Sequence, residues 1–127
     1  MHPSNEEILS RFLGYWATRD ADAMAALCAE DCIYDNVPEK KPMHGRAAIR
    51  QWLGFCFDHL TRIDVEVLHS ATNGEWTLSE RIDTHVIGDR HMPLPVMNVS
   101  RIVDGQIVEF RDYYDRLTVK ELGMLGD

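Results

Sequence analysis

The chain has 127 residues, of which 45% are hydrophobic and 27% charged, and its 21 acidic and 13 basic side chains give a net charge of −8. This composition is typical of one folded domain and excludes a disordered chain. Nucleic acids and anionic membranes select clusters of Lys and Arg, and the sequence has no such cluster. We therefore expect neither partner, and neutral or cationic small molecules remain open.

The cysteines and histidines carry little sign of a metal site. Cys28, Cys32 and Cys56 lie among apolar residues, so we expect reduced packing residues rather than a disulfide framework. No histidines pair at a ligand spacing, and we expect no metal. The N-terminus lacks the basic start and apolar run of a secretion signal, and no apolar run of roughly 18 residues occurs, so we expect a cytoplasmic protein.

Two helices are predicted at the start of the chain. Ser4 followed by Glu7 forms a capping box, and the apolar residues behind it repeat at helical spacing. This pattern predicts a helix over 5–18. Asp20 is placed to cap a short second helix that reaches Cys28.

A brief strand and a third helix are predicted next. Residues 32–34 are typical of a short strand, which ends at Pro38. After Gly45 the apolar positions again share one helical face. They predict a helix that ends near His59.

Alternating apolar residues mark the second half of the chain. From Arg62 the apolar period changes from about 3.6 to 2, which predicts a half-buried strand. Tight-turn dipeptides at 73–74, 88–89 and 104–105 then divide the rest into antiparallel strands over 75–87, 91–103 and 106–115. Helices first and strands later predict an α+β domain with helices on one face of a mixed sheet.

The predicted strand 75–87 has one polar face, made of Thr77, Ser79, Arg81, Asp83 and His85. Such a face is typical of a solvent-exposed surface, on which Arg81 and Asp83 would form a weak ion pair. It can equally line a polar pocket.

The position of Asp112 favours the interpretation that these polar residues line a pocket. Alternation places it on the same face of the last strand as Val108, Phe110 and Tyr114. Because burial of an unpaired carboxylate is unfavourable, Asp112 needs a cation or marks a polar pocket, and Arg81 could supply the charge.

Tyr34 and Asn36 share one face of the short predicted strand. Both are neutral hydrogen-bonding groups that could hold one water, or they could satisfy the strand end and the turn behind it. Both interpretations stay open.

Three signatures of the chain resemble those of limonene-1,2-epoxide hydrolases: Tyr34-Asp35-Asn36, Glu80-Arg81-Ile82-Asp83 and Arg111-Asp112-Tyr113-Tyr114-Asp115. The similarity extends from about residue 5 to about residue 120. It implies a single epoxide hydrolase-like domain over 1–127 with the cone-shaped nuclear transport factor 2-like fold. In that fold a curved mixed sheet and N-terminal helices enclose a deep pocket, commonly in a homodimer.

The resemblance also implies roles for residues. Asp112 would be the general base for a water held with Tyr34 and Asn36, Asp83 would protonate the epoxide oxygen, and Arg81 would bridge the two carboxylates. The partners would be a small hydrophobic epoxide and water, with no cofactor and no covalent intermediate. Two ionised Asp around one Arg would leave a net negative charge in an apolar cavity, so one Asp should keep its proton. The sequence by itself does not say which one.

Pockets of this family are lined mainly by aliphatic and aromatic groups. His85 stands where an aliphatic residue is typical, and it is either a polar pocket group or a histidine at the rim. Phe110 stands where Trp is typical, so the physiological epoxide stays open. The candidate substrate-binding residues are Met24, Leu27, His85, Leu94, Val96, Phe110 and Tyr114, with Val119 as a further candidate.

Two other functions remain open for this fold. One is a ketosteroid isomerase- or polyketide cyclase-like enzyme. The isomerase pattern calls for a Tyr and an Asp where this chain has Phe12 and Asn98, and an isomerase with Asp35 as base would leave Arg81 and Asp112 unexplained. A non-catalytic ligand-binding or dimerisation module would use the carboxylates only to pair with Arg81. Diol formation from a panel of epoxides separates a hydrolase from both.

Overall fold

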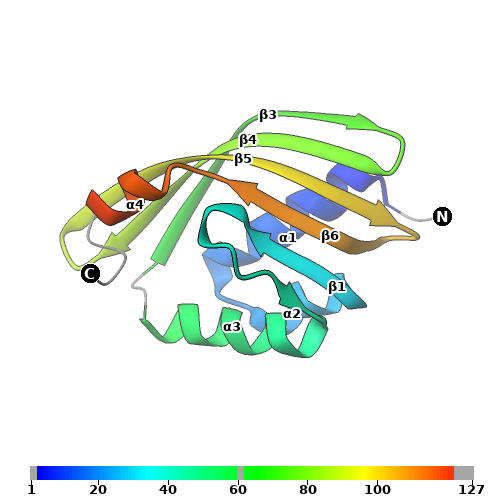
Figure 1. The fold of residues 1–127 in the computed structure, drawn as a ribbon, viewed down its shortest axis with the longest axis horizontal. Helices are drawn as coiled ribbons and strands as arrows, with labels where there is room; N and C mark the ends of the chain where they lie inside the picture. Colours follow the sequence, from blue (N-terminus) through cyan, green and yellow to red (C-terminus); the bar gives the residue numbers. More distant parts are fainter. Residues whose placement is uncertain (1–2, 60–61, 122–127) are drawn as a thin grey trace.

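The computed structural model describes residues 3–59 and 62–121. Helices occupy the first half of the chain and long strands the second, as the sequence predicts (Figure 1). In chain order the elements are α1 (Asn5–Thr18), α2 (Ala21–Ala26), β1 (Cys28–Asn36), the 3-10 helix η1 (Val37–Glu39), β2 (Met43–His44), α3 (Arg46–His59), β3 (Arg62–Asn73), β4 (Trp76–Ile87), β5 (Arg90–Val103), β6 (Gln106–Tyr113) and α4 (Arg116–Glu121).

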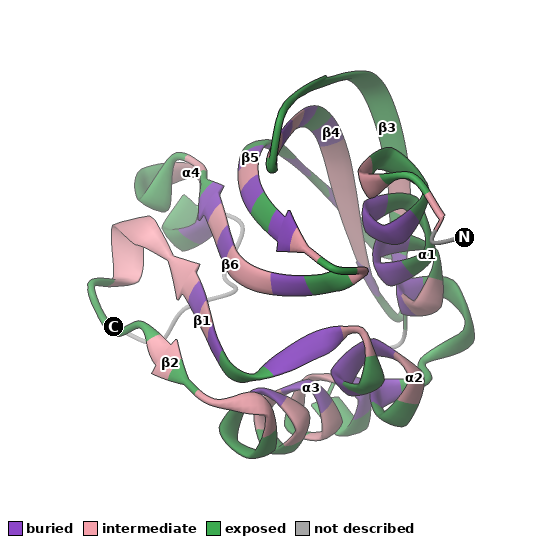
Figure 2. Ribbon diagram, turned by 90° about the vertical axis from the view of Figure 1, so that its right-hand side faces the viewer, coloured by how far each residue is buried: buried purple, intermediate pink, exposed green. Residues whose placement is uncertain are grey.

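The strands form one six-stranded sheet in the order β2-β1-β6-β5-β4-β3. All neighbours pair antiparallel except β1 and β6, which run parallel, so the sheet is mixed. The sheet curves strongly, and α1, α2 and α3 lie on its concave side (Figure 2). This arrangement confirms the α+β fold and the curved mixed sheet with N-terminal helices.

The first two helices begin where local capping predicts. The Ser4 hydroxyl accepts a hydrogen bond from the backbone N–H of Glu7, and the Asp20 carboxylate accepts one from the N–H of Ala23. The apolar stripe of α1 is buried against the sheet, with Phe12 fully enclosed. The predicted range 5–18 is confirmed.

Long-range pairing corrects the predicted strands. β1 begins at Cys28 rather than at residue 32, because its first residues lie beside Ile107 of β6. The short strand β2, which the sequence analysis missed, pairs with β1 at Ile33 and Tyr34. The last strand ends at Tyr113, before the predicted end at residue 115.

β3 is not half-buried along its length. Ile63 is buried and Val65 partly buried, but Val67 is 44% exposed and the residues after it are exposed. The reason is its position, since β3 lies at the edge of the sheet. The alternation of Ile63, Val65 and Val67 is therefore a misleading sign of burial.

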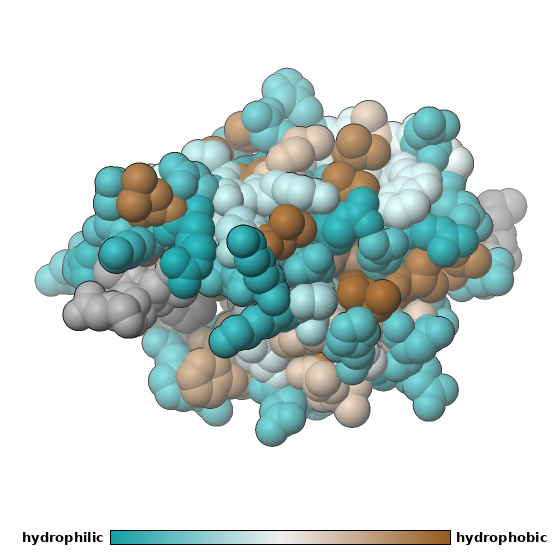
Figure 3. All heavy atoms as spheres, in the orientation of Figure 1, coloured by the Kyte–Doolittle hydropathy of each residue, from teal (hydrophilic) through white to brown (hydrophobic). Residues whose placement is uncertain are grey.

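Apolar side chains also lie on the outer face of the sheet. Met97 pairs with Tyr113 across β5 and β6, and these side chains are 40% and 43% exposed. Figure 3 shows hydrophobic residues interspersed with hydrophilic ones on the face that it presents. None of the helices in the described ranges is long and apolar enough to cross a membrane.

Candidate active site

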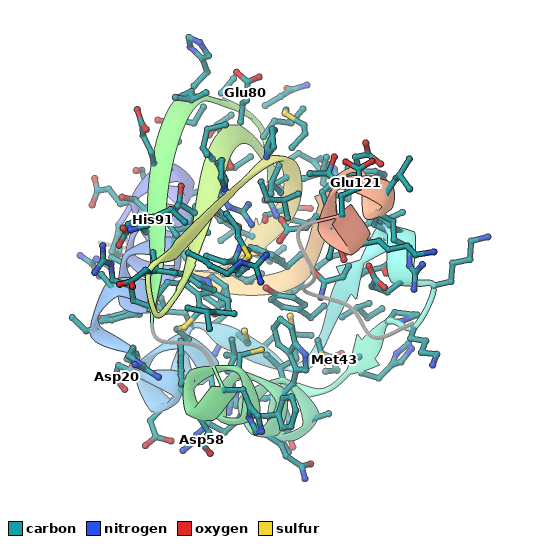
Figure 4. The ribbon with its side chains drawn as sticks, turned by 90° about the vertical axis from the view of Figure 1, so that its left-hand side faces the viewer. Asp20, Met43, Asp58, Glu80, His91 and Glu121 are labelled. Carbon is teal, nitrogen blue, oxygen red and sulfur yellow. The ribbon has the colours of Figure 1, made fainter. Side chains whose placement is uncertain are left out.

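A cavity of about 500 Å³ lies between the sheet and the helices. Figure 4 shows side chains of the sheet and of α3 pointing into the space between them, with Asp58, Glu80 and Glu121 pointing outward. Three strands contribute polar residues to the cavity wall: Arg81, Asp83 and His85 from β4, Asp112 from β6, and Tyr34 and Asn36 from β1. The five residues assigned to catalysis by resemblance therefore share one cavity.

The polar face of β4 points inward. Thr77, Ser79 and Arg81 are almost fully buried, whereas Trp76 and Leu78 on the apolar face are only partly buried. The structure thus excludes the solvent-exposed surface that this pattern allowed. The pocket interpretation is the one that fits.

Arg81 joins the two carboxylates through a double fork. Its Nη1 and Nη2 donate to Asp112 Oδ1 and Oδ2 at 3.0 and 2.7 Å. Its Nε and Nη2 donate to Asp83 Oδ1 and Oδ2 at 2.8 and 3.0 Å. Only 3% of the Arg81 side chain is exposed, so these charge-assisted bonds form in a site with little water. The two carboxylates are held in fixed positions on either side of the guanidinium.

Burial raises the pKa of Asp83, although the neighbouring Arg81 works against this shift. Asp112 receives one more hydrogen bond than Asp83, because the Asn98 amide donates to its Oδ1 at 2.8 Å. Three donated hydrogen bonds suit an ionised carboxylate. Burial therefore favours a proton on Asp83, while Asp112 has the larger number of hydrogen-bond donors around it.

Asn98 is the functional residue that sequence reasoning missed. Its amide also donates to the Arg111 carbonyl at 3.0 Å, and its own Oδ1 accepts a hydrogen bond from the Ser100 hydroxyl at 2.5 Å. Asn98 and Ser100 are fully buried. The register places Asn98 directly opposite Asp112, and this cross-strand pair was the available signal. Asn98 positions the Asp112 carboxylate.

Tyr34 and Asn36 lie beside the Asp112 strand, since β1 pairs with β6 in parallel and Asn36 is in register with Asp112. The Tyr34 ring stacks on Phe110 with 4.5 Å between ring centroids. Burial raises the pKa of Tyr34 and the nearby Asp112 adds to this, so its hydroxyl keeps its proton. Neutral hydroxyl and amide groups thus face the same cavity as the Asp112 carboxylate.

The apolar wall differs in part from the prediction. Leu94, Val96, Tyr114 and Val119 line the cavity, as does His85. Met24, Leu27 and Phe110 do not: Met24 and Phe110 are fully buried in the core, and Leu27 packs against that core. The cavity wall instead includes residues of the two longest helices, among them Trp16 of α1 and Trp52, Phe55, Cys56 and His59 of α3.

A second polar group lies at the wall near η1. The Glu39 carboxylate accepts hydrogen bonds from the Tyr114 hydroxyl at 2.7 Å and from Arg116 Nε at 3.1 Å. Asp35, the base that an isomerase would need, is not among the lining residues. Within residues 3–59 and 62–121, no group of three or more His, Cys, Asp or Glu side chains could hold a metal ion.

Comparison with known proteins identifies the family to which the chain belongs. The SnoaL-like domain model matches residues 9–110. The epoxide hydrolase EphG of Mycobacterium tuberculosis is 28% identical over 107 residues, which are 82% of this chain and 68% of EphG. The solved structure of an LEH-like epoxide hydrolase of M. tuberculosis has a TM-score of 0.81 at 24% identity, over 91% of this chain and 86% of that one.

A putative SnoaL-like polyketide cyclase of Shewanella putrefaciens is also similar, with a TM-score of 0.85 at 13% identity over 97% of this chain and 88% of that one. These similarities confirm the nuclear transport factor 2-like fold. Proteins named for different reactions share it, so the fold alone does not choose the chemistry. Since the family model spans α1 to Phe110 of β6, most of the chain, this protein belongs to the SnoaL-like domain family.

Proposed function

We propose that this protein is an epoxide hydrolase of the limonene-1,2-epoxide hydrolase type, which adds water to a small hydrophobic epoxide and releases a vicinal diol. The observation that carries the proposal is the buried fork of Arg81 between Asp83 and Asp112. General acid and base catalysis needs one protonated and one ionised group at fixed positions, and the surroundings of the two Asp residues differ in that sense.

The proposed reaction is a single displacement. Asp112, Tyr34 and Asn36 hold a water, and Asp112 takes one of its protons as the water oxygen bonds to an epoxide carbon. The bond between that carbon and the epoxide oxygen breaks, and Asp83 gives its proton to this oxygen. Arg81 stays in contact with both carboxylates throughout.

Charge is balanced through this step. Before reaction, protonated Asp83, ionised Asp112 and Arg81 sum to zero, and afterwards the two Asp residues have exchanged states around the same guanidinium. The buried trio therefore never carries a net charge, which would be costly in a cavity with this little water. Return of a proton from Asp112 to Asp83 through solvent completes the cycle.

The cavity favours an uncharged substrate. Among the described lining residues the charged or ionisable side chains, apart from histidine, cysteine and tyrosine, are Glu39, Arg81, Asp83 and Asp112. Arg81 is fully engaged by the two Asp residues, so a carboxylate substrate would meet Glu39 without a free cation. A neutral epoxide avoids this repulsion.

The testing experiment is diol formation from a panel of cyclic and linear epoxides, followed by a single turnover in ¹⁸O-labelled water with enzyme in excess. The expected diol is fully labelled at one oxygen in the first turnover, and Asp83 and Asp112 stay unlabelled by peptide mass spectrometry. Unlabelled first-turnover diol would show that an Asp attacks carbon, as in covalent hydrolases. No turnover of any epoxide by folded protein would favour a ligand-binding module.

The proposal includes a homodimer in the cytoplasm. The homodimer is supported by two apolar side chains, Met97 and Tyr113, that are exposed side by side on the outer face of the sheet. Light scattering should give twice the chain mass, and Met97→Glu should shift the protein toward the monomer. A monomeric wild type at micromolar concentration would contradict this part.

A further inference from the structure

Strand β4 contributes Arg81, Asp83 and His85 to the cavity wall. Of these three residues, only His85 has no part in the proposed reaction. It follows Asp83 by two residues on the same inward face. In register it lies between Ile63 of β3 and Met92 of β5, both buried. The imidazole therefore stands in an apolar patch beside the acid.

The backbone of Asp83 and Met92 comes close enough to the His85 ring to work against the fall of its pKa, but the ring is not fully paired. Within the described residues, Nδ1 of His85 is buried and has no hydrogen-bond partner. Because Nδ1 is buried and the ring lines the cavity, a ligand in the cavity would meet the ring on its Nε2 side. An aliphatic residue would fill this place without an unpaired polar group. A ligand group that pairs with the ring would account for the histidine.

The charge of the His85 ring limits the chemical class of the ligand group that could pair with it. Burial lowers the pKa of His85, although Asp83 beside it works in the opposite direction. Glu39, Asp83 and Asp112 also face the cavity, and Arg81 is taken up by the two Asp residues. A neutral imidazole offers one donor and one acceptor, and a hydroxyl group can pair with either one.

We propose that His85 binds a hydroxyl group of the substrate through Nε2, so that the enzyme selects hydroxylated cyclic epoxides over plain hydrocarbon epoxides. This inference rests on the proposed function. Two residues of a strand span about 6.6 Å, which separates the group that protonates the epoxide from the group that binds the hydroxyl. His85 is thus a specificity-determining residue and not part of the proton transfer.

The test compares two substrates that differ only in one hydroxyl group: cyclohexene oxide, and cyclohexene oxide with a hydroxyl on the ring carbon across from the epoxide. For the wild type we expect kcat/KM about tenfold higher for the hydroxylated epoxide, the value of about one neutral hydrogen bond. His85→Leu should remove this preference by lowering kcat/KM for the hydroxylated epoxide about tenfold relative to kcat/KM for cyclohexene oxide. His85→Gln should retain part of the preference, because its amide can also pair with a hydroxyl.

His69→Leu is the matched control, since His69 lies on the exposed edge strand and its side chain is 83% exposed. It should keep the wild-type preference. Equal kcat/KM for both epoxides in the wild type, or an unchanged preference in His85→Leu, would overturn the inference while leaving the hydrolase proposal intact. Equal loss of both activities in a folded His85→Leu protein, checked by thermal melting, would also overturn it. Failure of the hydrolase proposal itself gives a different result, no diol from either epoxide with wild-type protein.

Discussion

The proposed mechanism, in which Asp83 keeps its proton and Asp112 is ionised, predicts different effects on stability when each residue is replaced by Asn. Asp83→Asn replaces a carboxyl that must take up a proton on folding at pH 7, and Asn removes that cost, so the free energy of unfolding should be no lower than in the wild type. Asp112→Asn removes an ionised group that receives three hydrogen bonds and leaves the buried Arg81 with a protonated partner only. Both variants should lose at least about 100-fold in diol formation, since each removes a proton-transfer group.

The size of the stability effect follows from burial. Removing one partner of a buried ion pair costs about 3–5 kcal/mol, and Arg81 and Asp112 are 2% and 5% exposed. For a chain of this length, about 1 kcal/mol corresponds to roughly 4 °C in melting temperature. Asp112→Asn should therefore melt roughly 12–20 °C lower than the wild type at pH 7, whereas Asp83→Asn should melt no lower than the wild type.

The pH dependence gives a second measurement. A carboxyl whose pKa is raised by folding contributes its stability below the unfolded pKa of about 3.9, and this contribution is lost as pH rises through the folded pKa. Asp83→Asn lacks that loss, so its stability relative to wild type should improve as pH rises. Thermal melts of both variants from acidic to neutral pH test this trend. If Asp83→Asn is destabilised as much as Asp112→Asn at pH 7, Asp83 is ionised there and cannot be the acid.

Three further variants or reagents probe the same cavity. Arg81→Lys should lower kcat at least about 100-fold, because one ammonium cannot present a planar fork to two carboxylates, and near-normal turnover would contradict the bridging role. Asn98→Leu should lower kcat/KM by about 10–100-fold through loss of one bond to a charged group, and a folded variant with full activity would contradict the positioning role. Burial raises the pKa of Cys56 from 9.0 to about 12. At pH 8, iodoacetamide should therefore label the Cys56 thiol roughly 10³-fold more slowly than a free thiol, as followed by peptide mass spectrometry. Equal labelling rates would show that the thiol is not shielded.

Local signals account for the parts of the fold that the sequence predicts well. The caps at Ser4 and Asp20 and the turn dipeptides set helix starts and hairpins through neighbours a few residues apart. The length of β1 depends instead on β6, about 80 residues later in the chain, and β2 exists only because β1 offers it an edge. Such pairings leave no trace in a short window of sequence, which is why the predicted strand at 32–34 is too short.

The sequence also predicts only part of the candidate site. Alternation on β4 and β6 correctly separates Arg81 and Asp83 from their apolar neighbours and places Asp112 with Phe110. It does not say which face of β4 is buried, and here the polar one is. The reason is that polar groups can be buried when they satisfy one another, as Arg81, Asp83, Asp112 and Asn98 do. Their partners come from three strands, so only the sheet order reveals that the set is complete.

Helical periodicity has a related limit at the cavity wall. On α3 the apolar face includes Ile49 and Leu53, which are fully buried in the core, and also Trp52 and Cys56, which line the cavity. Neighbouring positions of one helical face thus meet either packed side chains or open space, depending on how far the sheet curves away from the helix. An apolar pattern indicates only that a helical face is shielded from bulk water, and it is the same for residues in the core and for residues at the cavity wall. Met24 and Leu27 were assigned to the pocket because the resembled family has aliphatic pocket linings, but the core fills the space around them.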